Sequence, residues 1–276
     1  MTGPRRIRLI DAGVLAPVRS QSIYHGLARA RTDESPDTIV LATPAEPYVS
    51  IGFHQDVERE LDVSYCEREG LPIVRREVGG GAVYLDSDQL FVQWIMNPRN
   101  LPVRVEQRFA LFARPLVDTY HEVGVDARFR PVNDIHVDGK KIGGTGAGHV
   151  GNAEVLVGNF LFDFDTERMA RIVNAPSAAF RDAVRDHLAC YITTLAREVV
   201  DPPDPSTVAG LYRNHCEHVL EAELFEAQPT ADEMREIEAV DARFLDASFV
   251  HRPGGLVRPG VKIHEDVWVH YNDYES

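Results

Sequence analysis

The sequence has little cysteine, little lysine and no long apolar run. Its three cysteines, Cys66, Cys190 and Cys216, are too few and too scattered for a disulfide framework and form no CxxC pair for zinc. Three scattered cysteines without a disulfide pattern favour a location of the protein in the reducing cytoplasm. No stretch of about 18 apolar residues is present, and no apolar run of signal length follows the N-terminal arginines. We therefore expect a protein that is not secreted and has no membrane partner.

Charge narrows the classes of ligand. The formal net charge is -14 and the pI is near 5.2, which argues against general affinity for nucleic acid or anionic membrane. An anionic ligand would need a local positive site. With 44% hydrophobic residues, the 276-residue chain can bury a large core, so one large domain, alone or with a small appendage, is expected.

Lysine is scarce and clustered. Only Lys140, Lys141 and Lys262 are lysines among 29 basic residues, and two of them are adjacent in one glycine-rich segment. A GC-rich genome or a salt-tolerant host would explain the preference for arginine. It would not explain the clustering.

Apolar patterns along the chain predict both strands and helices. The predicted strands are 6–10, 39–42, 48–53, 71–78, 90–96 and 155–164, with 39–42 and 48–53 forming a pair. The predicted helices are 17–31, 57–70, 105–123, 178–199, 206–226 and 230–246. Asp-Gly at 138–139 predicts a hairpin, and alternation over 261–269 predicts another. The segment DPPDPS at 201–206 is the best linker, dividing a large domain of 1–200 from a small part at 207–276.

The first informative motif is RREVGGGAVYLD at 75–86. Three consecutive glycines weaken any regular element, so they require a local reason. One interpretation is a tight or mobile hairpin turn. The other is backbone that lies against a ligand and offers N–H groups to a phosphate or carboxylate. Neither GxGxxG nor GxxxxGK[ST] occurs here, so the nucleotide folds that those patterns mark are not indicated.

The second motif is NDIHVDGKKIGGTGAG at 133–148. A lysine beside glycine backbone suits charge neutralisation on a reacting phosphate, because its ammonium is a compact cation and donor. Asn133 and Asp134 supply the oxygen ligands that magnesium prefers. The alternative is that Lys140 and Lys141 are ordinary exposed turn residues, which the flanking glycines and the rarity of lysine elsewhere disfavour.

These two motifs, together with YVSIGFHQD at 48–56 and NFLFDFD at 159–165, resemble the lipoate-protein ligases of the biotin/lipoate ligase superfamily. The resemblance covers roughly residues 5 to 200. It implies a mixed α/β sheet flanked by helices and related to class II aminoacyl-tRNA synthetases. It also implies that ATP, with Mg²⁺, and lipoic acid or octanoate condense to an acyl-adenylate, which a lysine of an apo carrier protein then attacks.

Site residues follow from the same resemblance, by position. Lys141 matches the essential lysine that bridges the acyl carbonyl and the α-phosphate, and is the implied catalytic residue. Asp134 is the implied magnesium ligand, and Arg76 is preferred to Arg75 for reaching the acyl head or phosphate. Asp163 and Asp165 are weaker candidates, since they can equally be a solvated strand end. The implied substrate-binding residues are Arg75, Arg76, Gly79, Gly80, Gly81, Val83, Tyr84, Asn133, Asp134, Lys141, Gly143, Gly144, Thr145 and Ala147, the last four after Lys141 lining the lipoyl tunnel.

The chain departs from the family pattern twice. At YLDSDQL, Leu85 and Asp88 stand where the family commonly has His and Gly of His-Asp-x-Gly-Asn. The stretch 206–276 resembles only the beginning of the family's small accessory domain. It is therefore a compact version of that domain, or a separate accessory subunit completes it.

Three rival functions remain. A lipoyl or octanoyl transferase forming a thioester needs an activated thiolate, but no cysteine lies between Cys66 and Cys190, and Cys190 is expected in the core. A cysteine-independent transferase and a non-catalytic carrier-binding homologue are the others. A biotin ligase lacks support because its GRGR-like loop is missing. Candidate carriers are lipoyl domains of 2-oxoacid dehydrogenases, the glycine-cleavage H protein, or a specialised lipoate-binding protein such as those of sulfur-oxidising bacteria.

Overall fold

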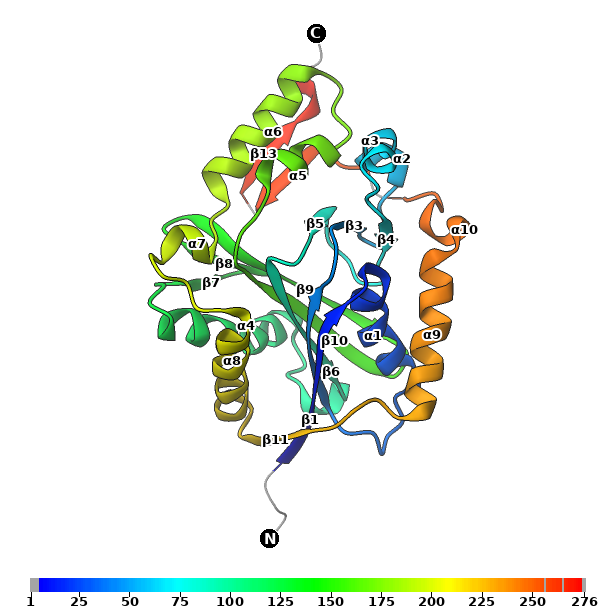
Figure 1. Ribbon diagram of the computed structural model, residues 1–276, viewed down its shortest axis with the longest axis vertical. Helices are drawn as coiled ribbons and strands as arrows, with labels where there is room; N and C mark the ends of the chain where they lie inside the picture. The colour runs from blue at the N-terminus through cyan, green and yellow to red at the C-terminus, as the bar shows by residue number, and fades with distance from the viewer. Residues whose placement is uncertain (1–4, 256, 265, 275–276) are drawn as a thin grey trace.

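A mixed eight-stranded sheet organises the chain. The computed structural model describes residues 5–255, 257–264 and 266–274. The strands lie in the order β11-β1-β2-β6-β10-β9-β8-β7 (Figure 1). β1 runs parallel to both of its neighbours, and the other neighbouring pairs are antiparallel. The bounds are β1 (Arg5–Leu15), β2 (Thr38–Pro44), β6 (Gln89–Met96), β7 (Arg128–Arg130), β8 (Asp134–Val137), β9 (Lys140–Val150), β10 (Ala153–Leu161) and β11 (Ala222–Glu226).

Helices cover both faces of this sheet. α1 (Pro17–Ala30) and α9 (Ala231–Leu245) pack together on one face, and α4 (Val105–Glu122) and α8 (Pro205–Leu220) pack together on the other (Figure 1). Alternate side chains of β2 show the two faces: Ile39 and Leu41 belong to the core beneath α4 and α8, and Val40 to the core beneath α1. Because both faces are covered, the central strands read as continuous apolar runs.

Two smaller sheets and short helices complete the structure. One sheet has the order β4-β3-β5, and the other is a C-terminal hairpin of β12 and β13, which lies beside α6 (Figure 1). The strands are β3 (Tyr48–Ile51), β4 (Ile73–Arg75), β5 (Val83–Leu85), β12 (Gly260–His264) and β13 (Val267–His270). The helices are α2 (Val57–Glu60), α3 (Val63–Arg68), α5 (Thr166–Ile172), α6 (Ala178–Tyr191), α7 (Leu195–Glu198), α10 (Ala247–Val250) and the 3₁₀ turns η1 (Pro98–Asn100) and η2 (Tyr271–Asp273).

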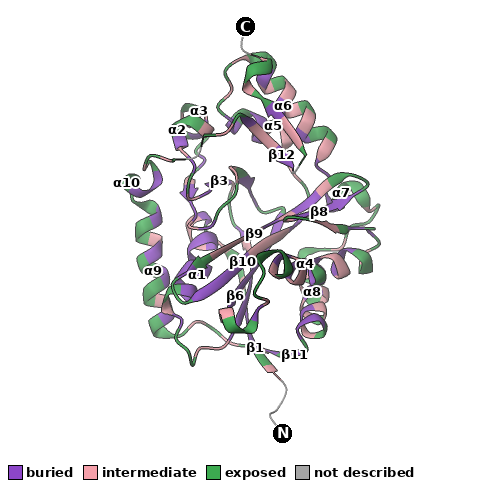
Figure 2. Cartoon of the chain, turned by 180° about the vertical axis from the view of Figure 1, so that it is seen from behind, coloured by how far each residue is buried: buried purple, intermediate pink, exposed green. Residues whose placement is uncertain are grey.

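Burial follows this layering. The sheet strands are largely buried, and the outer surfaces of α6 and α9 are exposed (Figure 2). Within the described residues, no helix combines the length and apolar character needed to cross a membrane.

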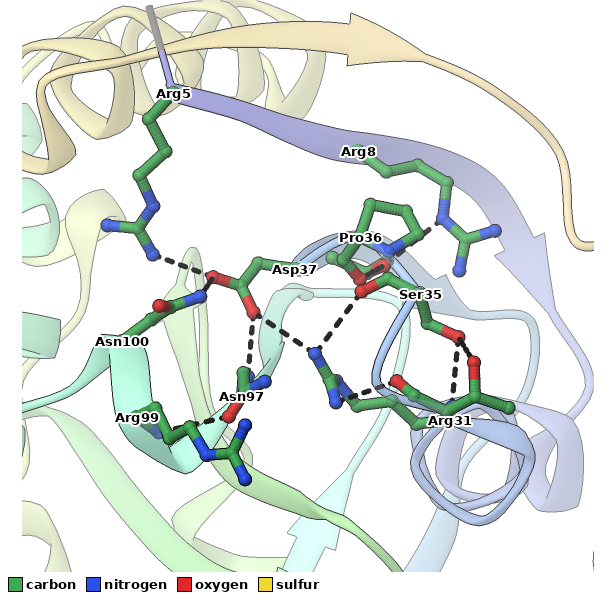
Figure 3. A network of polar contacts seen from close by, with 11 residues as sticks. Arg5, Arg8, Arg31, Ser35, Pro36, Asp37, Asn97, Arg99 and Asn100 are labelled. Carbon is green, nitrogen blue, oxygen red and sulfur yellow. Dashed lines mark hydrogen bonds and ion pairs between the residues drawn. The ribbon is translucent and has the colours of Figure 1, made fainter. Parts of the chain in front are cut away.

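A buried carboxylate ties the loops at the end of the large sheet together. Asp37, just before β2, accepts from Arg5 at 2.7 Å, from the backbone N–H of Asn97 at 2.6 Å and from Asn100 at 2.7 Å (Figure 3). The Arg31 guanidinium lies 3.8 Å from the same carboxylate. These contacts fix β1, the end of α1 and the turn η1 relative to β2.

Residues after the predicted linker are part of the same body. β11 pairs with β1 as an edge strand of the large sheet. Arg8 of β1 donates to both carboxylate oxygens of Glu233 at 2.8 and 2.5 Å, and Glu233 also closes the capping box that begins α9 at Thr230. The division into 1–200, a linker at 201–206 and 207–276 stays a prediction, and the sheet and the α1–α9 contact both cross it.

Most predicted elements are present, including the helices near 17–31, 105–123 and 230–246 and both hairpins. The pairing of 39–42 with 48–53 is wrong, since β2 lies in the large sheet and β3 in the small one. The helix at 57–70 is split by a fresh N-cap at Asp62, and that at 178–199 ends at Tyr191. Residues 222–226 form a strand and no helix, because α8 ends at the left-handed Glu221 (φ 49°).

The crossing of α1 and α9 yields a prediction about stability. A Cβ added at Gly26 would lie 2.5 Å from Ile237 Cα, so Gly26→Ala forces the helices apart. We expect it to lower the free energy of unfolding by about 1–3 kcal/mol. Gly210→Ala on α8 is the control, because its Cβ would meet open space and alanine favours a helix by about 1 kcal/mol over glycine. Urea denaturation measures the free energy of unfolding of both variants. An unchanged free energy of unfolding in Gly26→Ala would rule out this close packing of α1 and α9.

Candidate functional site

The two glycine-rich motifs meet at one cavity of about 340 Å³. Its lining includes residues from β6, β8, β9, β10 and α1, from the loop around Gly79–Gly81, from α5 and α6, and from the C-terminal hairpin. Twelve of the residues implied by the resemblance line it, namely Arg76, Gly79, Gly80, Gly81, Val83, Tyr84, Asn133, Asp134, Lys141, Gly143, Gly144 and Thr145.

Lys141 is held in this cavity by Asp134. It follows the hairpin turn at Asp138 and Gly139, whose φ values of 48° and 81° fit the Asp-Gly signal. The Lys141 Nζ lies 2.7 Å from Asp134 Oδ1, with the two side chains 26% and 3% exposed. Burial alone would raise the pKa of Asp134, but the nearby His136 imidazole and the Lys141 ammonium overcome that effect and hold the pKa well below its usual range. The Asp134 carboxylate is therefore ionised, and its contact with Nζ holds the end of the Lys141 side chain in place.

Gly144 provides the space for this contact. Strand register places Gly144 opposite Asp134, so the Lys141 side chain reaches its carboxylate by folding over Gly144. A Cβ at position 144 would lie 3.1 Å from both Cε and Nζ of Lys141. The path of the Lys141 side chain therefore explains why residue 144 is a glycine.

The triple-glycine loop presents N–H groups. Arg76 donates to the carbonyl oxygens of Gly79 at 3.0 Å and Gly81 at 2.7 Å, and Arg258 donates to that of Gly80 at 3.3 Å. Within the described residues, no acceptor is recorded for the three glycine N–H groups. Gly80 has φ 112°, a conformation that favours glycine. The carbonyls are thus turned to the arginines, which leaves the N–H groups available to an anion.

Adjacent arginines on β4 and just after it have different surroundings. Arg75 is fully buried and does not line the cavity, because its guanidinium donates to backbone carbonyls on both sides of it. These acceptors are the carbonyls of Gly52, Phe53, Gln55, Phe249, Val250 and Arg252. Arg75 therefore lies outside the cavity lining and ties the C-terminal region to the chain after β3, and ligand binding by Arg75 stays a prediction.

Three other predicted residues lie outside the cavity lining. Ala147, farther along β9, packs against the core beneath α4 and α8. Asp163 accepts from the N–H of Phe164 at 2.8 Å, and Asp165 caps α5 by accepting from the N–H of Arg168 at 2.8 Å. The interpretation of the two aspartates as a strand end, rather than a ligand site, fits these contacts.

One wall of the cavity is apolar. Its residues come from β10, α5 and α6 and the loops beside them, and they belong to one core cluster or pack against it. They are Leu161, Phe164, Met169, Leu188 and Ile192. The cavity therefore offers a cationic, amide-rich part and an apolar part together, as ligand sites commonly do.

The C-terminal hairpin supplies residues that the sequence motifs missed. Arg258, Lys262, Ile263 and His264 line the cavity. His264 is 4% exposed, and neither ring nitrogen has a hydrogen-bond partner among the described residues; its ring stands 5.1 Å from that of His136. The rarity of lysine was the one available signal, since Lys262 is the only lysine outside the 140–141 pair.

No cysteine lines the cavity within the described part of the chain. Cys66 and Cys216 are buried, and burial raises the pKa of the Cys66 thiol to about 11. The expectation that Cys190 lies in the core is wrong: it lies on the exposed side of α6. No group of three potential ligands from His, Cys, Asp and Glu gathers among the described residues, so Asp134 offers a single carboxylate to a cation.

Several known proteins are similar to this chain in sequence. The chain is similar to a putative lipoate-protein ligase A of Aeropyrum pernix, 32% identical over 153 residues, which are 55% of this chain and 53% of that protein. It is also similar to the octanoyltransferase LipM of Kyrpidia tusciae, 24% identical over 79% of this chain and 88% of that one. The matches span about half the length, or less, of the first lipoate ligases found.

Solved structures share the fold. A bipartite lipoate protein ligase of Thermoplasma acidophilum, studied with its E2 lipoyl domain, superposes with a TM-score of 0.82 at 21% identity, covering 93% of this chain and 99% of that one. A lipoate-protein ligase A bound with ATP gives 0.76 at 20% identity over 89% and 98%. A putative T. acidophilum ligase with bound lipoic acid gives 0.75 at 19% over 89% and 99%. The predicted fold, a mixed sheet flanked by helices, is confirmed.

The family model of the lipoyl protein ligase A/B catalytic domain matches residues 18–215. Because this match covers most of the chain and includes Lys141 and both glycine-rich segments, the protein belongs to the lipoyl protein ligase A/B catalytic domain family.

Proposed function

We propose that the protein is an ATP-dependent lipoate-protein ligase that activates lipoate or octanoate as an acyl-adenylate and transfers the acyl group to a lysine of a carrier protein. The observation that carries this proposal is the Lys141 ammonium, fixed by Asp134 beside glycine N–H groups in a cavity with an apolar wall. The solved relatives bound with ATP and with lipoic acid support both ligands.

Lys141 would act in the first half reaction. A lipoate carboxylate oxygen attacks the α-phosphorus of ATP, the bond to the β-phosphate oxygen breaks, and pyrophosphate leaves. The Lys141 ammonium donates to the carboxylate and to an α-phosphate oxygen, bringing two anions together and stabilising the charge that develops between them. The N–H groups of Gly79–Gly81 supply further donors, and Leu188 and Ile192 would pack against the acyl chain.

The same ammonium would act in the second half reaction. The carrier's lysine amine attacks the acyl carbonyl, the bond to the AMP oxygen breaks, and the nitrogen loses a proton. Lys141 then donates to the carbonyl oxygen as it becomes negative. A catalyst that contacts both the carbonyl and the phosphate therefore affects both halves of the reaction.

Magnesium would be shared between the nucleotide and the protein. Mg²⁺ keeps several waters and needs one or two carboxylates in addition to substrate phosphates, so the single buried carboxylate of Asp134, with Asn133 beside it, suits it. Bound there, the ion would neutralise phosphate charge. Asp134 must then divide its two oxygens between the cation and Lys141, since Oδ1 already accepts from Nζ.

A transferase is the second candidate, because the octanoyltransferase LipM of K. tusciae matches most of both chains. A transferase that passes its acyl group through a thioester needs a thiolate at the site. Neither buried cysteine lines the cavity, and Cys190 lies on the exposed side of α6. These positions support adenylation over a cysteine-bound intermediate.

The partner is proposed to be an apo lipoyl domain or a related lipoate-binding carrier, and the T. acidophilum structure with its E2 lipoyl domain supports that class. The same relative is bipartite, which supports a separate accessory subunit as a further partner. A cytoplasmic location with ATP available fits the proposal. The carriers to test are 2-oxoacid dehydrogenase lipoyl domains, the H protein and dedicated lipoate-binding proteins.

Lys141→Ala tests the catalytic role. We expect pyrophosphate release from ATP and lipoate to fall by about 10²-fold or more, because a charged donor to the transition state is lost. Lys140→Ala is the matched control, since Lys140 is exposed in the adjacent position and lies outside the cavity lining. Thermal unfolding monitors the fold of both. Normal turnover by Lys141→Ala would refute the assignment.

Gly144→Ala tests the geometry of the lysine. The new Cβ would lie 3.1 Å from the end of the flexible Lys141 side chain. That side chain can move away, so we expect the fold to be retained. The ammonium would leave its position beside Asp134, and we expect adenylation to slow by about 10-fold or more with little change in melting temperature. Full activity with the alanine in place would show that this path of the side chain is unimportant.

The amount of pyrophosphate released per lipoylated carrier distinguishes a ligase from a transferase. With lipoate, ATP and a candidate carrier, we expect one pyrophosphate per lipoylated carrier and no acylated enzyme in intact-mass spectra. Alkylation of Cys190, the exposed thiol, should leave the rate unchanged. A hydroxylamine-labile acyl-enzyme, or carrier modification from an acyl thioester donor without ATP, would instead establish the transferase.

A further inference from the structure

The C-terminal segment forms a cationic wall of the cavity. Arg258 and Lys262, both half-buried, line it from the segment that leads into the terminal hairpin and from β12 itself. The Arg258 guanidinium also rests on the triple-glycine loop: it donates to the Gly80 carbonyl at 3.3 Å, and a Cβ at Gly81 would lie 3.1 Å from its Nη1. This wall is thus in direct contact with the loop whose N–H groups are available to an anion.

The charge of the cavity is opposite to that of the protein. In a chain of net charge -14, the described lining contains the cations Arg76, Lys141, Arg258 and Lys262 and a single carboxylate, Asp134. Arg76 is occupied by glycine carbonyls, and Lys141 is paired with Asp134. Two of these four lining cations come from the C-terminal segment.

The segment is fastened on several sides. Arg130 of β7 forms an ion pair with Asp266 at the tip of the hairpin, and Tyr271 stacks on Phe180 of α6 with ring centroids 5.0 Å apart. Upstream, a Cβ added at Gly254 would lie 2.3 Å from the backbone of Gln55. Arg258 and Lys262 are therefore set in place by packing, which favours binding to a ligand of defined geometry over loose attraction.

We propose that Arg258 and Lys262 bind the β- and γ-phosphates of ATP and assist the departure of pyrophosphate. The inference rests on the proposed function and extends it. When the carboxylate attacks the α-phosphorus, the electron pair of the breaking bond goes to the β-phosphate oxygen, and cations at the β- and γ-phosphates stabilise that charge. The acyl-adenylate has lost both of these phosphates. Arg258 and Lys262 therefore act in adenylation and have no phosphate to bind during transfer, whereas Lys141 acts in both.

Separate assays of the two half reactions test this assignment. Arg258→Gln, Lys262→Gln and the double variant are each given ATP and lipoate, with pyrophosphate measured, and then chemically prepared lipoyl-AMP with an apo lipoyl domain. We expect each single variant to raise the KM for ATP or lower the adenylation rate by about 10-fold, the scale of one charge-assisted hydrogen bond, and the double variant to lose more. Transfer from lipoyl-AMP should stay within about 2-fold of the original chain.

Two matched controls show whether the effect depends on a cation that lines the cavity or on the loss of any positive charge. Arg252→Gln removes an arginine of the same segment that lies over the Phe53 ring and is not part of the lining. Lys140→Gln removes an exposed lysine. Both should adenylate normally. Unchanged adenylation in Arg258→Gln and Lys262→Gln would overturn the proposal, as would equal losses in both half reactions, which would mean a purely structural wall.

The test also distinguishes this inference from the proposed function. If the unmodified protein transfers from lipoyl-AMP but makes no pyrophosphate from ATP and lipoate, the ligase proposal fails and the phosphate assignment fails with it. If the unmodified protein does both and the variants behave as it does, only the assignment of Arg258 and Lys262 fails.

Discussion

The site depends on one ion pair, between the Lys141 ammonium and the Asp134 carboxylate. The pair forms across β8 and β9, where the residue opposite Asp134 is a glycine and therefore has no side chain to block the contact. A lysine is a flexible point charge, and its catalytic use requires that it stop moving. Gly144, opposite Asp134 in the β8–β9 ladder, lets the lysine fold back to the carboxylate at 2.7 Å. Burial makes that carboxylate a strong partner, since water screens it little.

Arginines determine the rest of the geometry through backbone carbonyls. Arg75 binds carbonyls of the chain after β3 and of residues near α10, so it links two segments far apart in sequence. Arg76 and Arg258 bind the carbonyls of the glycine loop and so orient its N–H groups. In this acidic protein, Arg75 and Arg76 thus organise backbone around the cavity, whereas the ammonium of Lys141 is paired with the carboxylate of Asp134.

The sequence indicated the segments of the candidate site in those places where local chemistry decides the structure. The Asp-Gly turn predicted the hairpin of β8 and β9, and the lysine pair beside the glycines indicated a segment that lines the cavity; both signals act within a few residues. Sequence reasoning failed where distant contacts decide. The sequence predicts ligand binding by both Arg75 and Arg76, with Arg76 preferred, and only the surrounding carbonyls show that Arg75 lies outside the cavity. The strand β11 and the cavity-lining Arg258 and Lys262 depend on pairing and packing with segments that no local pattern names.

The fold therefore brings Lys141, from the centre of the chain, and the cationic wall of Arg258 and Lys262, from near its end, to one cavity that also has an apolar wall. The most direct test is a crystal structure of the protein with lipoyl-AMP. The account predicts Lys141 Nζ within about 3 Å of both the acyl carbonyl oxygen and an α-phosphate oxygen, the distance of a charge-assisted hydrogen bond. An Nζ turned to solvent, with the adenylate bound elsewhere, would contradict it.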